Sequence, residues 1–329
     1  VEEALACYTQ ACQYNPALVA AFKSRVQILH TLGRDGEAQQ AHNQLQYLQR
    51  LPKPLLAVMD LMHQGKLLRA EDLCRQFLQK FPRQVEAMRL LADIGVRLGV
   101  MDDAEFLLES AVQFEPDNVA ARVDYVQVLR RRQRFEQALD QARALLSKEP
   151  DNPQFQSIYA VISMQAGDYE EALRYFDLIL ERLPGDAGTL TSKGHALKTR
   201  GDFEAAVTSY RQAFDAKPDH GEAFYSLSNL KTYRFADEEF VRMHELLDDQ
   251  RTAVSDRIYL SFALGKGYED RGDYEQAFRH YESGNRLKKI ESRYDADQMS
   301  ADLSAQARVC TRSLFEDRDG MGCQAPDPV

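Results

Sequence analysis

The sequence has no apolar run long enough to cross a bilayer, so we expect no membrane-spanning helix. Its first residues, VEEALACYTQ, lack the basic start and apolar stretch of a secretory signal. They read as the interior of a helix, so we expect the natural start to lie upstream. Acidic residues outnumber basic ones, 51 to 41, which gives a net charge of −10, whereas general nucleic-acid binding needs a positive surface. We therefore expect neither a membrane nor a nucleic-acid partner.

Motifs of metal and redox chemistry are missing as well. The five cysteines are odd in number and form no CxxC pair, which indicates reduced thiols in a cytoplasmic protein. They are Cys7, Cys12, Cys74, Cys310 and Cys323. None of the seven histidines has metal-ligand spacing, and no HExxH motif occurs. Spacing alone indicates no catalytic triad, so the sequence predicts no catalytic, metal or cofactor site within these residues.

What the sequence does contain is a repeat with a period of 34 residues. Proline recurs at this step, and an alanine stands twelve residues before each proline. The prolines are Pro82, Pro116, Pro150, Pro184 and Pro218, and the alanines are Ala70, Ala104, Ala138, Ala172 and Ala206. Short turn sequences such as GDYEEA (167–172) and GDFEAA (201–206) precede several of the alanines. Self-similarity at a fixed period predicts a protein of stacked repeats.

Each repeat reads as two helices. Tyr169 and Phe176 recur at helical spacing on one apolar face, and Phe155 opens a similar face in the preceding segment. Gly167 is expected in the turn between the two helices, and Pro184 is expected to end the second helix. Small residues at fixed positions let two helices approach closely, so we expect Ala172 and Ala206 to be buried where paired helices meet.

These residues resemble the tetratricopeptide repeat (TPR) family. The family has small side chains, bulky side chains and a proline at fixed positions, occupied here by Gly194, Ala206, Ala213, Leu190, Leu197, Tyr210 and Pro218. The resemblance implies an all-α fold, a right-handed superhelical solenoid of about eight helix-turn-helix units. We expect the regular array to span residues 1–218.

The frame changes over residues 219–290, where we expect divergent units that end the array. Phe240 stands where alanine would keep the frame, and Ala277 lies 71 residues after Ala206 instead of 68. The stretch GEAFYSLSNLKTYRF (221–235) reads as one helix, followed by a helix whose apolar side includes Phe240. Gly284-Asn285 is expected to end the last helix in a new direction, since both residues tolerate left-handed conformation.

The segments NLKTYRFADEE and FALGKGYEDRGDYEQAFRHYESGN, with YDAD at 294–297, are similar to the end of the repeat array in bacterial TPR-containing sulfotransferases. That resemblance implies that residues 291–329, ending in CQAPDPV, are a linker to a catalytic domain beyond Val329. The sulfate donor of the family, 3′-phosphoadenylyl sulfate, would then bind in that missing domain. Within this chain, Gly188-Thr189 resembles part of a phosphate loop, but Pro184 keeps the repeat frame, so we expect an inter-unit turn there.

The geometry of the TPR family implies a concave groove lined by first-helix positions. Mapped onto this sequence, the groove residues are Arg89, Asp93, Arg97, Gln127, Arg130, Arg131, His195, Lys198, Tyr225, Asn229 and Thr232. Arginines and a lysine in a groove favour an acidic peptide, while a solvated groove, or one filled by the missing domain, is the alternative. The run RRRQR (130–134) is otherwise typical of a solvated helix end.

The leading hypothesis is a protein-binding array that recruits or positions a protein or peptide substrate for a sulfotransferase domain. Two alternatives are a free-standing scaffold without an enzyme and an array that precedes a different transferase, such as a glycosyltransferase.

Overall fold

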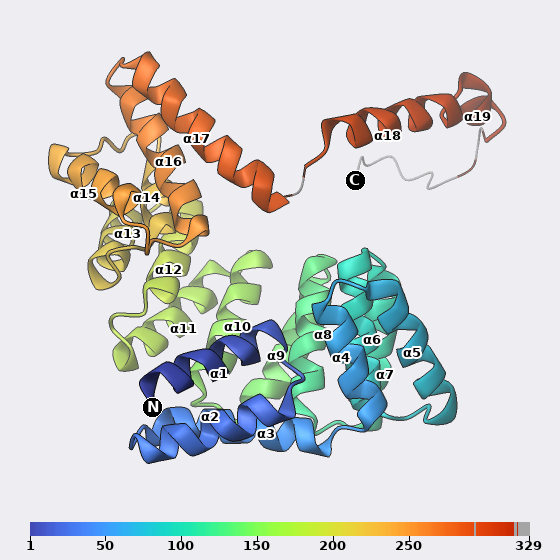
Figure 1. Cartoon of the computed structure of the whole chain (residues 1–329). Coiled ribbons are helices and arrows are strands. Elements are labelled where there is room, and N and C mark those ends of the chain that lie inside the picture. The colour runs from blue at the N-terminus through green and yellow to red at the C-terminus, as the bar shows by residue number, and fades with distance from the viewer. Residues whose placement is uncertain (293, 319–320, 322–329) are drawn as a thin grey trace. The chain divides into compact units, whose positions relative to one another are not determined.

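A computed structural model describes residues 1–292, 294–318 and 321, and in them the chain forms nineteen α-helices and no strand (Figure 1). The all-α expectation is therefore confirmed. None of the helices in these ranges is long and apolar enough to cross a membrane. Cys323 and the terminal CQAPDPV, with its Asp-Pro step, lie outside the described residues.

The chain divides into two compact units, Val1–Pro184 and Gly185–Val329. The N-terminal unit contains α1 (Glu2–Tyr14), α2 (Val19–Thr31), α3 (Asp35–Arg50), α4 (Lys53–His63), α5 (Leu67–Lys80), α6 (Val85–Leu98), α7 (Met101–Phe114), α8 (Val119–Arg131), α9 (Phe135–Lys148), α10 (Pro153–Gln165) and α11 (Tyr169–Arg182). From α2 onward these helices form packed pairs, α2 with α3 through α10 with α11. Short connections of a few residues join them, as the repeat predicts.

The turn inside a pair depends on one residue in left-handed conformation. Gly167, between α10 and α11, has φ = 92°, and the side chain of Asp168 accepts a hydrogen bond from the backbone N–H of Glu171 at 3.1 Å. Glycine adopts this conformation without the steric cost that a Cβ atom brings. Gln133 occupies the equivalent position between α8 and α9 and is the one non-glycine residue with positive φ in the described part of the chain.

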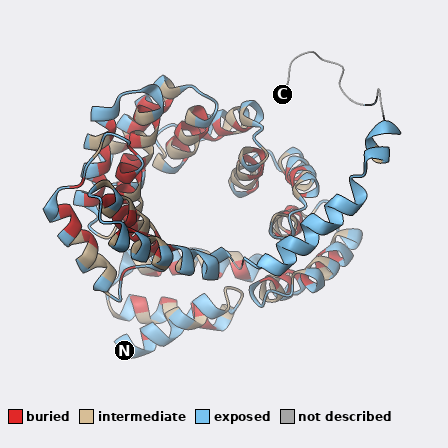
Figure 2. Cartoon of the chain, turned by 90° about the horizontal axis from the view of Figure 1, so that it is seen from above, coloured by how far each residue is buried: buried red, intermediate tan, exposed pale blue. Residues whose placement is uncertain are grey.

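In Figure 2 buried residues colour one side of many of the helices, and exposed residues colour the other. Ala172 and Ala206 are both fully buried, as predicted from their places in the repeat. In the C-terminal unit Gly194 lies against the ring of Tyr210, where a Cβ atom would come within 2.4 Å of Cε1. Small residues therefore stand where helices approach most closely.

The C-terminal unit contains α12 (Ala187–Arg200), α13 (Phe203–Ala216), α14 (Gly221–Ser228), α15 (Asp237–Asp248), α16 (Val254–Asp270), α17 (Tyr274–Ser292), α18 (Ala296–Val309) and α19 (Arg312–Glu316). The pairs α12–α13 and α16–α17 pack closely, whereas α14 packs on α13 and α16. α15 packs on α16 and not closely on α14, so the described residues contain seven closely packed helix pairs, and α14 with α15 stands in the place of the eighth expected unit. The boundaries predicted at residues 218 and 290 remain predictions.

The helix expected over 221–235 is wrong in its second half, because α14 ends at Ser228. The following loop is held by packing: Phe235 is buried and its ring meets that of Phe240 edge-on at 6.1 Å. The hydroxyl of Tyr233 also donates to Glu239 at 2.6 Å. Phe240 is buried in α15, as its predicted apolar side requires.

The expectation that Gly284-Asn285 ends the last helix is also wrong, since α17 continues to Ser292. Gly284 stands 71 residues after Ala213, which places it in a small-residue position of the repeat. A Cβ atom there would lie 3.2 Å from the side chain of Ser261, so this glycine permits close packing of α17 on α16. Lys289 occupies the position of the repeat proline and does not interrupt the helix.

Gly188-Thr189 was expected in an inter-unit turn, but both residues belong to the first turn of α12. The side chain of Asp186 caps this helix by accepting a hydrogen bond from the backbone N–H of Thr189 at 2.8 Å. In the predicted linker, residues 296–309 and 312–316 form α18 and α19, which have no buried residue. The predicted linker is thus helical over these ranges.

Candidate functional site

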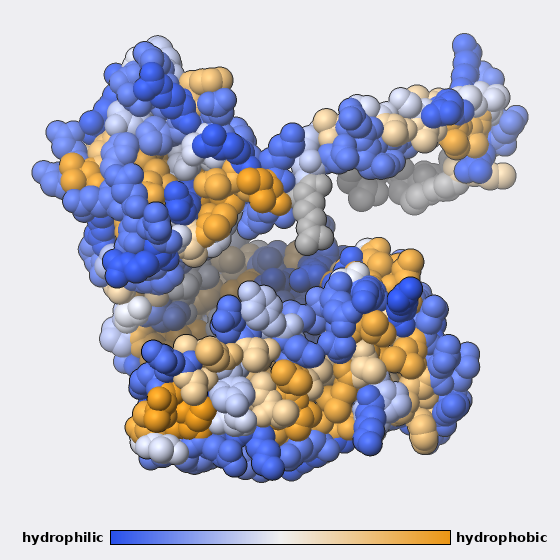
Figure 3. All heavy atoms as spheres, viewed as in Figure 1, coloured by the Kyte–Doolittle hydropathy of each residue, from blue (hydrophilic) through white to orange (hydrophobic). Residues whose placement is uncertain are grey.

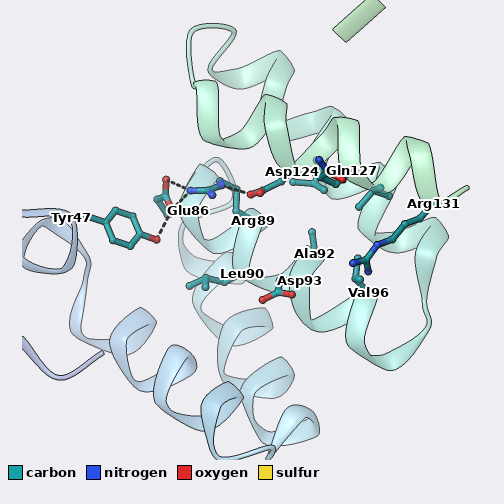
Figure 4. Close-up of a pocket in the computed structure, with 12 residues that line it drawn as sticks. Tyr47, Glu86, Arg89, Leu90, Ala92, Asp93, Val96, Asp124, Gln127 and Arg131 are labelled. Carbon is teal, nitrogen blue, oxygen red and sulfur yellow. Dashed lines mark hydrogen bonds and ion pairs between the residues drawn. The ribbon is translucent and has the colours of Figure 1, made fainter. Parts of the chain in front are cut away.

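A half-enclosed cavity of about 300 Å³ opens in the N-terminal unit among helices α3, α6, α7 and α8 (Figure 4). Its apolar wall consists of Leu90, Ala92, Val96, Leu108 and Val128. Its polar residues are Tyr47, Glu86, Arg89, Asp93, Asp124, Gln127 and Arg131. An apolar wall with a few converging polar groups is the usual composition of a ligand site.

A chain of three interactions runs along one side of the cavity. The hydroxyl of Tyr47 on α3 donates to Glu86 at 3.0 Å, and Arg89 on α6 binds the same carboxylate at 2.9 Å. Arg89 also binds Asp124 on α8 at 2.7 Å, so its guanidinium joins neighbouring repeats. The side chain of Arg89 is only 19% exposed, so water competes little for these contacts.

Burial shifts the pKa values of residues in this series of three interactions. Burial, followed by the Glu86 carboxylate, raises the pKa of Tyr47 to about 12, so the phenol remains a hydrogen-bond donor at neutral pH. Burial also raises the pKa of Asp124, and the guanidinium of Arg89 opposes that shift. Removing Arg89 would therefore leave two carboxylates without their cation.

The remaining charged groups differ in their pairing. Asp93 binds Arg97 at 2.9 Å one turn along α6, and both side chains are about half exposed. Arg131, at the end of α8, has neither a hydrogen bond nor an ion pair with any described residue. In Figure 4 its side chain points toward Val96 and the cavity. The charges of Arg89 and Arg97 are thus both paired, and Arg131 remains available to a ligand.

The structure brings four of the predicted groove residues together in this cavity: Arg89, Asp93, Gln127 and Arg131. Arg97 lines a smaller depression beside it, which it shares with Asp93 and Leu90. Arg130 is half-buried on α8 and does not line the cavity.

The other predicted groove residues belong to the C-terminal unit. His195 and Lys198 lie on α12 and Tyr225 on α14, while Asn229 and Thr232 are exposed in the loop after α14. His195 is engaged, because its Nδ1 lies 2.9 Å from the Tyr210 hydroxyl and its Nε2 lies 3.6 Å from Glu222. A single groove lined by all eleven residues stays a prediction.

Sequence reasoning missed Tyr47, Glu86 and Asp124. Glu86 could have been predicted to pair with Arg89, since it stands three residues before Arg89 on the same helix face. Asp124 and Tyr47 reach the site from other repeats, and no local pattern marks them. No group of three or more potential metal-ligating side chains occurs within the described ranges.

Apolar side chains also reach the outer surface of the N-terminal unit, where they form patches among hydrophilic residues (Figure 3). Leu68 and Phe106 are the most exposed of these on α5 and α7, each at 68%. They lie on second helices of their repeats and do not line the cavity described above.

Two family models match part of the chain. Residues 73–189 match the family model of the TPR domain of cytochrome c-type biogenesis protein H, and residues 187–220 match a model of the tetratricopeptide repeat. Among curated relatives, the chain is 24% identical to the TPR repeat-containing protein YpiA of Bacillus subtilis over 230 residues, which are 68% of this chain and 52% of YpiA. An uncharacterised protein of Aquifex aeolicus is 26% identical over 58% of this chain and 25% of its own length. The chain therefore spans between a quarter and about half of the length of these relatives.

Two solved structures have similar helix arrangements. YrrB, described as a TPR protein with an unusual peptide-binding site, has a TM-score of 0.44 and 16% identity over 67% of this chain and 96% of YrrB. MamA has a TM-score of 0.45 and 16% identity over 49% of this chain and 94% of MamA. The family models and the 34-residue period of the sequence agree with each other. Residues 73–220 therefore match tetratricopeptide repeats, and they are all-α in the structure.

Proposed function

We propose that the N-terminal unit binds a peptide segment of a protein partner in the cavity, with an acidic side chain of that segment against Arg131. The observation that carries the proposal is the unpaired guanidinium of Arg131 beside an apolar wall. A glutamate or aspartate side chain combines a carboxylate with an apolar stem, which suits this pairing of surfaces. The Gln127 amide, next along the polar side, can donate a further hydrogen bond.

The polar chain of Tyr47, Glu86 and Arg89 supports binding in a different way. Because its charges are already paired, it forms a fixed wall and does not compete for the ligand carboxylate. It also holds α6 against α8, so little ordering of the cavity is needed on binding. A peptide-binding site is described for YrrB too, but the proposal here stands on the cavity itself.

Fluorescence anisotropy with two labelled peptides of equal length, one rich in Glu and one with Gln at the same positions, tests the proposal. We expect tighter binding of the acidic peptide and weakening as salt rises, because salt screens exposed charges beyond about 8 Å. Arg131→Gln should weaken acidic-peptide binding by about 10- to 100-fold, as for loss of a charged hydrogen bond.

Arg130→Gln is the matched control, since Arg130 precedes Arg131 on α8 and lies outside the cavity. It should change affinity little. Equal binding of the two peptides, or equal effects of the two substitutions, would remove the acidic-peptide proposal.

We further propose that the array recruits its partner for a bacterial sulfotransferase domain that follows Val329. This proposal is supported by the resemblance of residues 229–297 to the end of the array in such enzymes. The coding sequence after Val329 tests it: a strand followed by a loop rich in Arg, Ser, Gly and Thr supports it. A stop codon there would favour the free-standing scaffold.

The cytoplasm is the compartment we propose. Cys7, Cys12, Cys74 and Cys310 are free thiols in the structure, as a reducing compartment would keep them. Cell fractionation with an antibody to the chain tests this location, and recovery from the periplasm would refute it.

A further inference from the structure

A second, smaller cavity of about 170 Å³ lies in the C-terminal unit and is lined by aromatic rings. Tyr225 comes from α14, and Tyr259 and Phe262 come from α16. The ring centroid of Tyr225 lies 5.3 Å from that of Tyr259 and 6.2 Å from that of Phe262. All three side chains are half-buried, so each ring keeps part of its surface open to a ligand.

The charges around these rings favour a cation. Glu222 stands three residues before Tyr225 on α14, and Glu291 on α17 lines the cavity. The hydrogen bond from His195 holds the pKa of Glu222 below its usual value, so this carboxylate is ionised at neutral pH. Lys288 is the cation of the cavity lining, and Glu291 binds its ammonium group at 2.5 Å. Within the lining, Glu291 and Lys288 are thus paired with each other, and Glu222, which lies outside the lining, is a second carboxylate whose charge acts on Tyr259.

Burial and the neighbouring charges both affect the hydroxyl of Tyr259. Burial, followed by the Glu222 carboxylate, raises the pKa of Tyr259, and Lys288 acts in the opposite direction. Tyr225 and Glu291 add to the rise. The groups around the ring of Tyr259 therefore act together as a negative environment, with Lys288 as the exception.

We propose that this aromatic cavity binds an arginine side chain of a partner protein. The faces of aromatic rings attract cations, and a planar guanidinium stacks on them more readily than an ammonium group does. Its N–H groups can then donate to Glu291, which lines the cavity beside the rings. An acidic side chain would be repelled by Glu291 and Glu222.

This inference does not rest on the acidic-peptide proposal, because the two cavities share no residue. The C-terminal unit would recognise a positive side chain, whereas the N-terminal unit would recognise a negative one. A partner segment that carries both charges, or two different partners, would satisfy the two sites.

The test uses the full chain with ¹³C-labelled isoleucine methyl groups and N-acetyl-arginine methylamide as the probe. Ile258 lines the cavity, so its methyl resonance reports binding directly. Ile94, fully buried in the N-terminal unit, serves as an internal reference. We expect a saturable shift of Ile258 with the arginine probe, none of Ile94, and no shift with the uncharged citrulline analogue.

Two variants make the test specific. Phe262→Leu removes a ring while keeping an apolar side chain, and Glu222→Gln removes one charge, so each should weaken binding about two- to fivefold. Tyr274→Leu is the matched control, because Tyr274 is 71% exposed on α17 and lies outside the cavity. Unchanged methyl spectra elsewhere would show that each variant is folded.

Three results would overturn the inference. The first is an equal shift of Ile258 with arginine and citrulline probes, which would indicate an apolar site. The second is binding of N-acetyl-glutamate methylamide in preference to the arginine probe. The third is no shift of Ile258 up to the solubility limit of the arginine probe. None of these outcomes depends on Arg131, so the acidic-peptide site would be judged separately.

Discussion

Gly194 in α12 offers a sharp test of how closely these helices pack. A Cβ atom at this position would lie 2.4 Å from Cε1 and 2.7 Å from Cδ1 of Tyr210. The ring of Tyr210 is fully buried, and its hydroxyl is held 2.9 Å from Nδ1 of His195, so it has no room to withdraw. Gly194→Ala should therefore behave as overpacking, which costs about 1–3 kcal/mol.

The helix itself opposes this cost. Alanine is favoured over glycine within a helix by about 1 kcal/mol. Because the contact is shorter than Cβ atoms normally make, we take the upper end of the overpacking range and expect a net loss of about 2 kcal/mol. Urea unfolding followed by far-ultraviolet circular dichroism measures this change, provided that the slopes of the transitions agree.

Gly188→Ala is the matched control in the same helix. Its nearest neighbour would be Oδ2 of Asp186 at 3.7 Å, an ordinary contact, so stability should stay unchanged or rise by up to about 1 kcal/mol. Tyr210→Leu combined with Gly194→Ala should cost less than the sum of the two single changes by about 1–2 kcal/mol, because the smaller side chain makes room. Equal stability of the two alanine variants, or strict additivity in the double variant, would refute this account of the packing.

Three further predictions concern packing, pH and the sulfate donor. Ala172→Leu and Ala206→Leu should each lower the free energy of unfolding in urea by about 1–3 kcal/mol, and unchanged midpoints would contradict their burial. Burial and the neighbouring His244 hold the pKa of His280 below 6.5, so stability is full above that pH and is lost as the pH falls through the lower, folded-state pKa. Between about pH 7.5 and about pH 5.5 the urea midpoint should fall less in His280→Asn than in the parent. An equal fall of the midpoint with pH in both proteins would contradict this. Residues 1–329 should not bind the desulfated form of 3′-phosphoadenylyl sulfate in a calorimetric titration, whereas a protein extended past Val329 should bind it. Tight binding by residues 1–329 would indicate a missed site.

The repeat period predicted the helix pairs because the contacts within a pair connect residues close together in sequence. Gly194 and Tyr210 are sixteen residues apart, and Gly265 and Tyr281 keep the same separation after the frame has shifted. In both cases a Cβ atom on the glycine would meet the tyrosine ring within 2.6 Å. Such pairs can be predicted from the sequence, because a tyrosine ring at one position requires a glycine at the position that it packs against.

The errors arise where a residue has two valid roles. Gly284 can end a helix or permit close packing, and the choice depends on Ser261 and Phe262 on the neighbouring helix. Similarly, nothing local in the stretch after Ser228 distinguishes a continuing helix from a loop held by the buried ring of Phe235. Tertiary packing decides both cases, and the sequence contains that information only indirectly.

Four residues of the cavity, Arg89, Asp93, Gln127 and Arg131, are among the groove positions that the resemblance to the TPR family implies. Their pairing does not follow from it, because Asp124 and Tyr47 reach the cavity from other helices. A count of arginines therefore overestimated the positive charge that a ligand would meet.

The interactions of Arg89 also limit how this array can change during evolution. Repeat proteins gain and lose whole repeats, because each repeat mainly contacts its neighbours. Tyr47 on α3, Glu86 on α6 and Asp124 on α8 must keep their separation for the three contacts to form. Duplication or deletion of a helix pair between α3 and α8 would separate them and leave a buried charge unpaired. Changes in repeat number are therefore expected outside this segment, which would be inherited as one block.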